Sequence, residues 1–343
     1  MTTQEMQSVT TDVEQKRLLH EGLQSVEDAM FTVVNSDVTV LRDASNHILQ
    51  AGGKRVRPRL LMLAYLASGG TDVKYAAAPG AAVELMHTAS VVHDDINDHG
   101  VMRRGRPSVN AKWGRTFALL TGDFLFTAVY ELMAEYGDIN GDLASAATGL
   151  VEGETLQAWA VKNDEFTREN YMQIIALKTA ALFKSAGTMG AKLAGADDDV
   201  VEALGNYAFN IGLAFQIIDD ILDIVGDEVT LGKTSGIDIE QGRGFTAVEN
   251  GNGNGSNGHS SNGNGNGTNG HSANGNGNGN GKSAMEVAEE VKRKLMSGNR
   301  LEEARQQARG LVNMAIQSLD VLPESYAKEG LIDLAHKVID RDK

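Results

Sequence analysis

Residues 85–107 read LMHTASVVHDDINDHGVMRRGRP, an apolar lead-in that turns acidic and then basic. On a helix, Asp94 and Asp98 are four residues apart, so their carboxylates share one face. Like charges that close repel each other unless a cation lies between them. Carboxylate oxygens beside free coordination positions suit Mg²⁺, which takes its remaining ligands from water and substrate phosphates. This stretch therefore predicts a helix that ends in a metal site.

The basic residues of this stretch suit a guest that carries phosphate. Arg103, Arg104 and Arg106 follow directly after the acidic cluster. A guanidinium group pairs bidentately with phosphate oxygens, and it stays charged under all ordinary conditions. One short stretch thus predicts both a metal site and a clamp for a polyphosphate.

The composition of the whole chain favours helices. Of its 343 residues, 41% are hydrophobic, which is enough for a sizeable core, and only four are proline. Long stretches are rich in Ala, Leu, Met, Glu and Gln, and no alternation with period two is long enough to require a sheet. We therefore expect an all-α fold, with helices at residues 18–49, 60–70, 76–99, 117–136, 143–161, 171–193, 200–225, 283–316 and 325–339.

Charge and residue usage exclude several classes of protein. The formal net charge of −15 argues against a nucleic-acid partner, because nucleic-acid phosphates would be repelled. The absence of cysteine excludes disulfides, thiolate zinc sites and cysteine nucleophiles. The first fifteen residues lack the basic and apolar regions of a signal peptide, and the most apolar stretch, residues 117–133, is interrupted by Asp123 and Glu131. We expect a cytoplasmic protein with no transmembrane segment.

The domain organisation follows from a change of composition after residue 248. Residues 251–281 hold 12 of the chain's 39 glycines, interleaved with Asn and Ser, and such a tract cannot form a core. Helical patterning resumes after it, which favours an insertion over a linker between two domains. We expect a disordered N-terminus at residues 1–17 and a single all-α domain at 18–343, interrupted by a disordered insertion at about 249–282.

A second acidic cluster lies about 125 residues after the first. Asp219, Asp220 and Asp223 occur in FQIIDDILDIVGD, at the end of a mostly apolar helical stretch. An Asp-rich helix often presents a solvated face, but both clusters here follow strongly apolar segments, where an unpaired charge is costly. Helix bundles build metal sites from inward-facing carboxylates on different helices. The two clusters therefore predict a shared Mg²⁺-polyphosphate site.

Further cations lie in two other segments. Residues 52–58, GGKRVRP, form a glycine-initiated basic turn that predicts a second anion pocket, although most basic turns are merely exposed and a P-loop pattern is absent. Lys178 is a lone cation in the apolar segment IALKTAALF, and Lys233 follows the second acidic cluster. A lysine in an apolar helix often extends to the surface instead of binding a ligand.

Five motifs in this order resemble the trans-isoprenyl diphosphate synthase family: GGKRVRP, HDDINDHGVMRRGRPSVN, EGETLQ, KTAALF and FQIIDDILD. The resemblance covers residues 18–242 and 283–343. It implies an isoprenoid-synthase helical bundle around a deep central cavity, normally a homodimer. It also implies Mg²⁺-dependent, head-to-tail transfer of a prenyl group from an allylic diphosphate to isopentenyl diphosphate.

The resemblance assigns a role to each matching position. Magnesium ions that bridge the allylic diphosphate are implied for Asp94, Asp98 and Asp219, with Asp95 and Asp223 in support and Asp223 counted among the metal ligands. The six aspartates of the two motifs, including Asp220, and Lys178 are implied as the catalytic residues. Contacts with isopentenyl diphosphate are implied for Lys54, Arg57, His87 and Arg104. Contacts with the allylic diphosphate are implied for Arg103, Lys178, Thr179, Gln216 and Lys233. The chain departs from the family pattern at residues 242–250, where GRGFTAVEN replaces the usual basic residue and helix start.

The residues just before the first acidic cluster bear on product length. In the family, large aromatic residues one helical turn before this cluster block the tunnel, whereas here Ala89 and Ser90 are small. HTASVVHDD resembles the long-chain members and predicts a product of six or more isoprene units, which would leave the enzyme for a membrane through peripheral contact. The tunnel floor could instead come from another helix, for instance at Phe124 or Phe126.

Other functions remain open on the sequence. A short-chain farnesyl or geranylgeranyl diphosphate synthase would share all five motifs. A non-catalytic subunit of a heteromeric synthase would share the fold, but such subunits have typically lost an acidic motif, and both are intact here. A terpene cyclase usually pairs the first motif with a different second motif and lacks the GGKRVRP segment.

Overall fold

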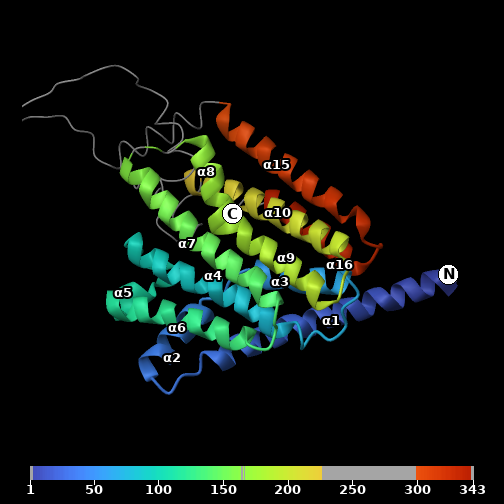
Figure 1. The fold of residues 1–343 in the computed structure, drawn as a ribbon, viewed down its shortest axis with the longest axis horizontal. Helices are drawn as coiled ribbons and strands as arrows, with labels where there is room; N and C mark the ends of the chain where they lie inside the picture. Colours follow the sequence, from blue (N-terminus) through green and yellow to red (C-terminus); the bar gives the residue numbers. More distant parts are fainter. Residues whose placement is uncertain (1–2, 164, 166, 226–298, 341–343) are drawn as a thin grey trace, which may run out of the picture.

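The computed structural model describes residues 3–163, 165, 167–225 and 299–340, and it confirms the all-α prediction (Figure 1). The helices before the first acidic cluster are α1 Thr3–Val33, α2 Thr39–Gln50, α3 Val56–Ala67 and α4 Ala77–Asn97. The middle helices are α5 Val109–Trp113, α6 Arg115–Met133, α7 Ile139–Asn163, α8 Arg168–Ile175, the π-helical turn η1 Ala176–Ala180, α9 Ala181–Leu193 and α10 Asp198–Val225. The C-terminal helices are α15 Arg300–Ser318, the 3₁₀ turn η2 Leu319–Val321 and α16 Tyr326–Ile339. The expected insertion at 249–282 lies outside the described residues.

A short hairpin follows α4. Strands β1 Met102–Arg103 and β2 Arg106–Pro107 pair antiparallel, with Arg103 opposite Arg106. Arg104 and Gly105 form the turn, and Arg104 adopts a positive φ of 52°. The basic residues of the opening motif therefore lie on a tight hairpin beside the end of α4.

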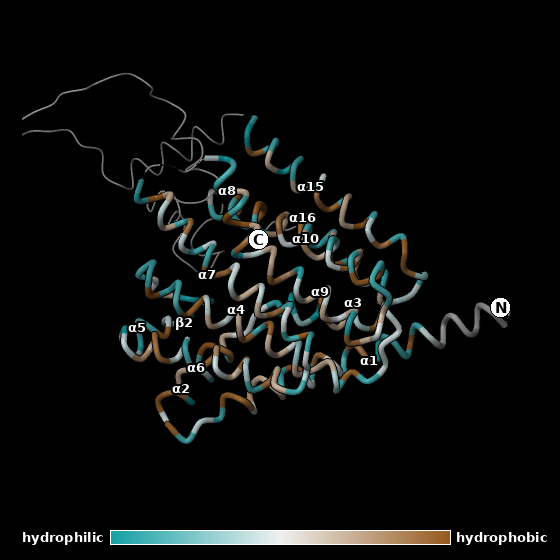
Figure 2. Tube along the Cα trace, viewed as in Figure 1, coloured by the Kyte–Doolittle hydropathy of each residue, from teal (hydrophilic) through white to brown (hydrophobic). Residues whose placement is uncertain are grey.

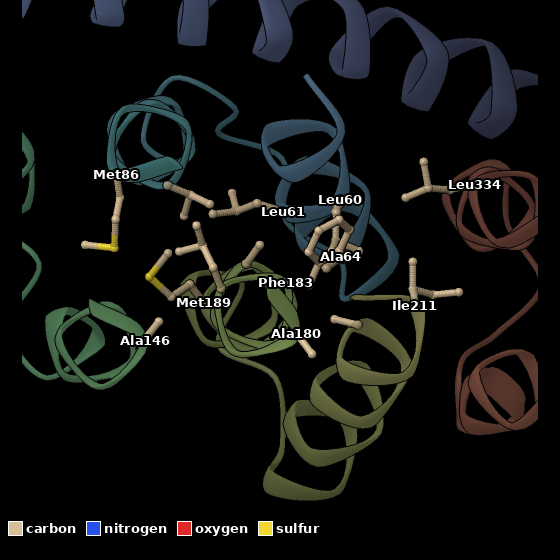
Figure 3. Packing of buried hydrophobic residues seen from close by; sticks show 14 of the residues in the cluster. Leu60, Leu61, Ala64, Met86, Ala146, Ala180, Phe183, Met189, Ile211 and Leu334 are labelled. Atoms are coloured by element: carbon tan, nitrogen blue, oxygen red, sulfur yellow. The ribbon is translucent and has the colours of Figure 1, made fainter. Parts of the chain in front are cut away.

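The bundle is built in layers around two central helices. The packing order runs from α2 and α6 through α4 to α3 and α9, and then through α10 to α15 at the opposite side (Figure 1). Figure 3 shows the centre, where Leu60, Leu61 and Ala64 of α3 meet Phe183 and Met189 of α9. A Cβ atom at Gly190 of α9 would collide with the carbonyl oxygen of Leu61, so glycine permits this close approach. The central packing fixes the positions of α4 and α10, which carry the acidic clusters.

The N-terminus differs from the sequence prediction. Residues 1–17 were expected to be disordered, but α1 begins at Thr3. Asp12 Oδ1 accepts a 3.2 Å hydrogen bond from the backbone N–H of Tyr326, and Gln15 Oε1 accepts a 3.0 Å bond from that of Ala327. The first N–H groups of a helix have no partner within the helix. Side chains of α1 therefore cap α16, a contact between the two ends of the chain that local polarity cannot predict.

The expected single helix at residues 18–49 is also wrong. The structure ends α1 at Val33 and begins α2 at Thr39. The sequence between them is Val34-Asn35-Ser36-Asp37-Val38, and Ser36 Oγ accepts a 3.1 Å bond from the backbone N–H of Val38. Such short polar side chains offer the backbone an alternative to helical hydrogen bonds. The break turns α2 back toward α6.

Helix α6 carries apolar residues on its exposed side as well as on its buried side, and such residues recur along its trace in Figure 2. It is the one helix in the described residues that is long and apolar enough to cross a membrane by length and composition. One side packs on α4, and Ala118 and Leu125 are fully buried there. Its other side exposes Phe117, Leu119, Leu120 and Tyr130. An exposed apolar patch of this kind marks a surface that contacts another molecule.

Candidate active site

A cavity of about 390 Å³ opens where α4, α7, η1 and α10 meet. Its acidic and basic lining residues are Asp94, Asp98, Glu154, Asp219, Asp220, Arg57, His87, Arg103, Arg104 and Lys178. Its other lining residues are Ser90, Val91, Leu150, Gln157, Tyr171, Ile174, Ile175, Thr179, Phe215 and Gln216. Residues of both acidic motifs thus share one cavity with Arg57, Arg103 and Arg104 of the predicted anion pockets, whereas Arg55 and Arg106 of the same motifs do not line it.

One face of α4 supplies the first wall. Lining residues His87, Val91, Asp94 and Asp98 follow one another at three- and four-residue spacing, and Ser90 lies three residues after His87 and four before Asp94. Residues with this spacing lie on one face of a helix. Asp98 ends α4, and its backbone N–H donates to the carbonyl oxygen of Asp94 over 2.8 Å. The helix therefore terminates between its two cavity-facing carboxylates.

The first acidic motif is crowded with negative charge. The pKa of Asp94 is raised to about 7, chiefly by burial. The cation of Lys178 lowers this pKa, whereas the charges of Glu154 and Asp98 and a hydrogen bond from Glu154 raise it. Carboxylates in such a cluster share protons until a cation compensates their charge.

Lys178 lies in the cavity and not at the surface. Its Nζ contacts Glu154 Oε1 at 2.5 Å and donates to Gln157 Oε1 over 2.8 Å. It belongs to the π-helical turn η1, whose wider winding brings both Lys178 and Thr179 to the cavity. A Cβ atom at Gly153 of α7 would lie 2.8 Å from Cγ of Lys178, so glycine makes room for the lysine stem. The alternative that Lys178 extends to the surface is wrong.

A chain of hydrogen bonds holds the second acidic motif. Tyr171 of α8 donates its hydroxyl to Asp220 Oδ2 over 2.7 Å, and Gln216 Nε2 donates to Asp220 Oδ1 over 2.8 Å. Thr179 Oγ1 in turn donates to Gln216 Oε1 over 2.8 Å. Both oxygens of Asp220 are therefore engaged by neutral donors. Its neighbour Asp219 lines the same cavity.

The basic end of the cavity gathers arginines around one histidine. Burial lowers the pKa of His87 well below its ordinary value, and the charges of Arg57, Arg104, Arg103 and Arg55 lower it further. The imidazole is therefore neutral at physiological pH. The Arg57 guanidinium lies over the Phe183 ring, 4.7 Å from its centroid. This end can receive an anionic group of its own, separate from the carboxylates.

The carboxylates fit a hard divalent cation. All donors are oxygens, which Mg²⁺ and Ca²⁺ prefer. No group of three or more His, Asp or Glu side chains in the described part of the chain forms a ready-made metal cage. A cation there would have to complete its coordination with water or with oxygens of a bound ligand, as Mg²⁺ does in phosphate sites.

Comparison with known proteins identifies the family. A family model described as polyprenyl synthetase matches residues 38–249. The chain belongs to the polyprenyl synthetase family. The octaprenyl diphosphate synthase of Escherichia coli (strain K12) is 33% identical over 331 residues, which cover 95% of this chain and 98% of that protein. A short chain isoprenyl diphosphate synthase of Methanothermobacter thermautotrophicus is 43% identical over 216 residues, covering 61% of this chain and 66% of that protein.

A solved structure supports the same assignment. The polyprenyl synthase of Caulobacter crescentus CB15, complexed with calcium and isoprenyl diphosphate, superposes with a TM-score of 0.82. It is 28% identical in sequence, and the match covers 96% of this chain and 98% of that one. The resemblance inferred from five motifs and the predicted isoprenoid-synthase bundle are thereby confirmed.

Several predicted site residues of this polyprenyl synthetase lie away from the cavity lining. Asp95 is buried and accepts from Arg103 Nη2 over 2.8 Å and from its Nε over 3.2 Å. Asp223 is buried, and Lys54 is exposed. Asp95 therefore orients Arg103 in this structure, while Lys233 lies outside the described residues.

Of the two residues predicted to set product length, only Ser90 lines the cavity. Ala89 is fully buried in the hydrophobic core. Successive helical residues are rotated by about 100°, so the face that carries Ser90 and Asp94 turns Ala89 aside. The alternative floor residues Phe124 and Phe126 of α6 are partly buried and also lie outside the cavity lining.

Sequence reasoning missed three residues of the polyprenyl synthetase site. Glu154 and Gln157 lie in the EGETLQ motif, and their three-residue spacing could have indicated one shared helix face. Tyr171 carried no local signal, because its partner Asp220 is 49 residues away.

Proposed function

We propose that the protein is a Mg²⁺-dependent prenyltransferase that condenses isopentenyl diphosphate head-to-tail with an allylic diphosphate to give a trans-polyprenyl diphosphate. One observation carries the proposal: carboxylates from α4 and α10 and a separate group of arginines line the same cavity. Two anionic substrates can therefore bind side by side, one through metal and one through arginine.

At the acidic end, Asp94, Asp98 and Asp219 would hold Mg²⁺, with Asp223 behind them. Bound there, the metal supplies positive charge that stabilises the departing diphosphate. The calcium in the Caulobacter crescentus complex is consistent with a divalent cation held by oxygen ligands. The crowding that raises the pKa of Asp94 to about 7 also favours a cation between these carboxylates.

The cavity's own side chains position the reacting groups. Lys178 lies beside Glu154 at the acidic end and adds a positive charge for the allylic diphosphate. Arg57 and Arg104, with neutral His87 as a hydrogen-bonding partner, hold isopentenyl diphosphate so that its double bond lies beside the allylic carbon. Binding both substrates in one cavity makes an otherwise bimolecular attack effectively intramolecular.

The reaction balances without a further reagent. The allylic C–O bond breaks, and its electron pair leaves on the diphosphate. The double-bond electrons of isopentenyl diphosphate form the new C–C bond, and one proton is lost to regenerate a double bond. We assign the released diphosphate as the proton acceptor, and the arginines and Lys178 stabilise its charge.

We propose that the product is long, with six or more isoprene units. Ser90 is the small residue of α4 on the cavity wall, and the apolar residues Val91, Leu150 and Phe215 line the same cavity. The octaprenyl diphosphate synthase relative matches over nearly its whole length, whereas the short-chain relative matches over 66% of its own. A short-chain product is the alternative.

We also propose that the protein is a cytoplasmic homodimer that touches membranes only peripherally, to release its product. The support is the apolar side of α6, where Phe117, Leu119, Leu120 and Tyr130 are exposed. Packing this side against a second copy would bury apolar area at about 25 cal/mol per Å². Sedimentation at micromolar concentration tests it: a dimer is expected, and a Leu119→Glu, Leu120→Glu variant should sediment as a monomer.

The decisive assay uses labelled isopentenyl diphosphate with farnesyl diphosphate and Mg²⁺. Elongated linear alcohols after dephosphorylation would support the synthase and report chain length. A cyclic hydrocarbon would indicate a cyclase instead. No product from the pure protein would indicate a subunit that needs a partner.

A further inference from the structure

The turn between α2 and α3 holds a strained backbone. Gly52 and Gly53 have φ values of 75° and 153°, and Arg55 has a φ of 45° although it carries a side chain. Non-glycine residues rarely adopt this left-handed conformation, because Cβ approaches the backbone closely. Such strain persists only where surrounding contacts fix it, and it gathers at functional sites.

The side chain of Arg55 supplies those contacts. Its Nε donates to Glu27 Oε1 over 2.6 Å, and its Nη1 donates to Glu84 Oε1 over 3.1 Å. Its Nη2 donates to the carbonyl oxygen of Leu49 over 3.1 Å and to Glu27 Oε2 over 3.4 Å. One guanidinium thus ties together α1, the end of α2 and α4, and it lies outside the cavity lining.

The turn that Arg55 fixes contacts the arginine end of the cavity on two sides. A Cβ atom at Gly53 would lie 2.7 Å from Nη1 of Arg104, so the turn packs directly on that guanidinium. Arg57 follows Arg55 by two residues, in the first turn of α3. Any movement of the turn would therefore move Arg57 and loosen Arg104.

Glu84 links the same network to α4. It is buried, with 2% of its surface exposed, and it lies one helical turn before His87. Its charge opposes the lowering of the Arg104 pKa that burial causes. A buried carboxylate beside several arginines reduces their mutual repulsion while no substrate is bound.

We propose that Arg55, held by Glu27 and Glu84, is a positioning residue for the isopentenyl diphosphate pocket. It touches no substrate itself, and it acts by keeping Arg57 and Arg104 in place. The inference rests on the proposed function, because it takes the arginine end of the cavity as the pocket for isopentenyl diphosphate. The alternative is that the ion pairs stabilise the fold alone.

The test measures binding of isopentenyl diphosphate without metal, by calorimetry, in wild type, Arg55→Lys and Arg59→Lys. Lysine keeps the charge of Arg55 but cannot reach three partners at once, so the dissociation constant should rise about tenfold. Arg59, four residues after Arg55 in α3 and outside the cavity lining, is the matched control, and Arg59→Lys should bind as wild type does. The Mg²⁺-dependent affinity for a thiolo analogue of the allylic diphosphate should change less than about twofold in Arg55→Lys.

A second variant, Glu27→Gln, frees Arg55 from α1 without altering α3, α4 or the cavity. It should also weaken the binding of isopentenyl diphosphate, and the dissociation constant should rise about threefold. Unchanged isopentenyl affinity in both variants, or equal weakening of both ligands with a large fall in Tm, would overturn the inference. If the wild-type protein bound isopentenyl diphosphate tightly but formed no product, the proposed function would be contradicted, but the positioning role of Arg55 would not.

Discussion

The hydroxyl of Tyr171 donates a 2.7 Å hydrogen bond to Oδ2 of Asp220, and both side chains are buried. Because Gln216 donates to the other oxygen of Asp220, this carboxylate has a fixed orientation before any ligand arrives. Its neighbour Asp219 reaches the same cavity. Tyr171 therefore connects α8 to the acidic end of the site and holds Asp220 of the second motif in place.

Replacing Tyr171 by Phe should impair use of the allylic substrate. The change removes the hydroxyl donor and leaves one buried oxygen of Asp220 without its hydrogen bond, which costs about 1–3 kcal/mol of free energy. We expect kcat/KM for the allylic diphosphate to fall about tenfold, while KM for isopentenyl diphosphate changes little. Tyr326→Phe, on α16, is the control and should behave as wild type. Unaltered kinetics in Tyr171→Phe would show that the Tyr171 hydroxyl is not needed to hold Asp220 for catalysis.

Metal binding should weaken in mild acid. The pKa of Asp94 is about 7 in the metal-free protein, so protons compete with Mg²⁺ for this carboxylate. The apparent Mg²⁺ affinity should fall about tenfold from pH 8 to pH 6, as followed by calorimetry. Glu154→Gln removes a charge that raises this pKa, so its profile should shift to lower pH. A Mg²⁺ affinity that does not change between pH 8 and pH 6 would contradict the assignment of Asp94 as a metal ligand.

Protonation of Asp94, which weakens metal binding, stabilises the fold of the metal-free protein. Because the folded-state pKa of Asp94 lies above the ordinary aspartate value of 3.8, the folded state binds the extra proton. This contribution to stability is fully present below about pH 3.8 and is lost as pH rises through about 7. Urea unfolding in EDTA should therefore show that wild type loses stability between about pH 4 and pH 7 and that Asp94→Asn lacks this loss.

His87 should act as a neutral hydrogen-bonding group. Its pKa lies well below the ordinary range because of burial and four nearby arginines. A glutamine can offer a similar neutral donor and acceptor, so His87→Gln should keep KM for isopentenyl diphosphate within about threefold of wild type. His87→Leu should raise that KM about tenfold. If His87→Gln were as damaging as His87→Leu, a cationic imidazole would be indicated instead.

Product length should respond to Ser90 more cleanly than to Ala89. A tyrosine at Ser90 would project into the cavity, whereas one at Ala89 would overpack the core and destabilise the fold by about 1–3 kcal/mol. We expect Ser90→Tyr to shorten the product, as measured by mass spectrometry of the dephosphorylated alcohols. Ser90→Ala is the control, and its product should match wild type. The same chain length from Ser90→Tyr would place the floor on another helix.

The parts of the site that the sequence could predict are those set by local spacing. Asp94 and Asp98 share a helix face because they are four residues apart, and the same spacing explains why Ser90 lines the cavity while Ala89 does not. The change of winding at η1 breaks the 3.6-residue period, so the direction of Lys178 could not be read from the pattern.

The parts that could not be predicted depend on contacts between distant segments. Tyr171 and Asp220 lie on different helices, and the cap that Asp12 gives to Tyr326 joins residues 314 positions apart. Nothing in the neighbourhood of Asp12 indicates that its segment has a partner, so the N-terminus read as disordered. Long-range pairing of this kind follows from the packing of the whole bundle and not from local propensity.

The most direct test of the two-site account is calorimetry with isopentenyl diphosphate and a non-reactive thiolo analogue of farnesyl diphosphate. One molecule of each ligand should bind per chain, both at the same time. The analogue should require Mg²⁺ and lose its binding in Asp94→Asn. Isopentenyl diphosphate should bind in EDTA, and its dissociation constant should rise at least tenfold in Arg57→Gln. Mutual exclusion of the two ligands from a single site would contradict the account.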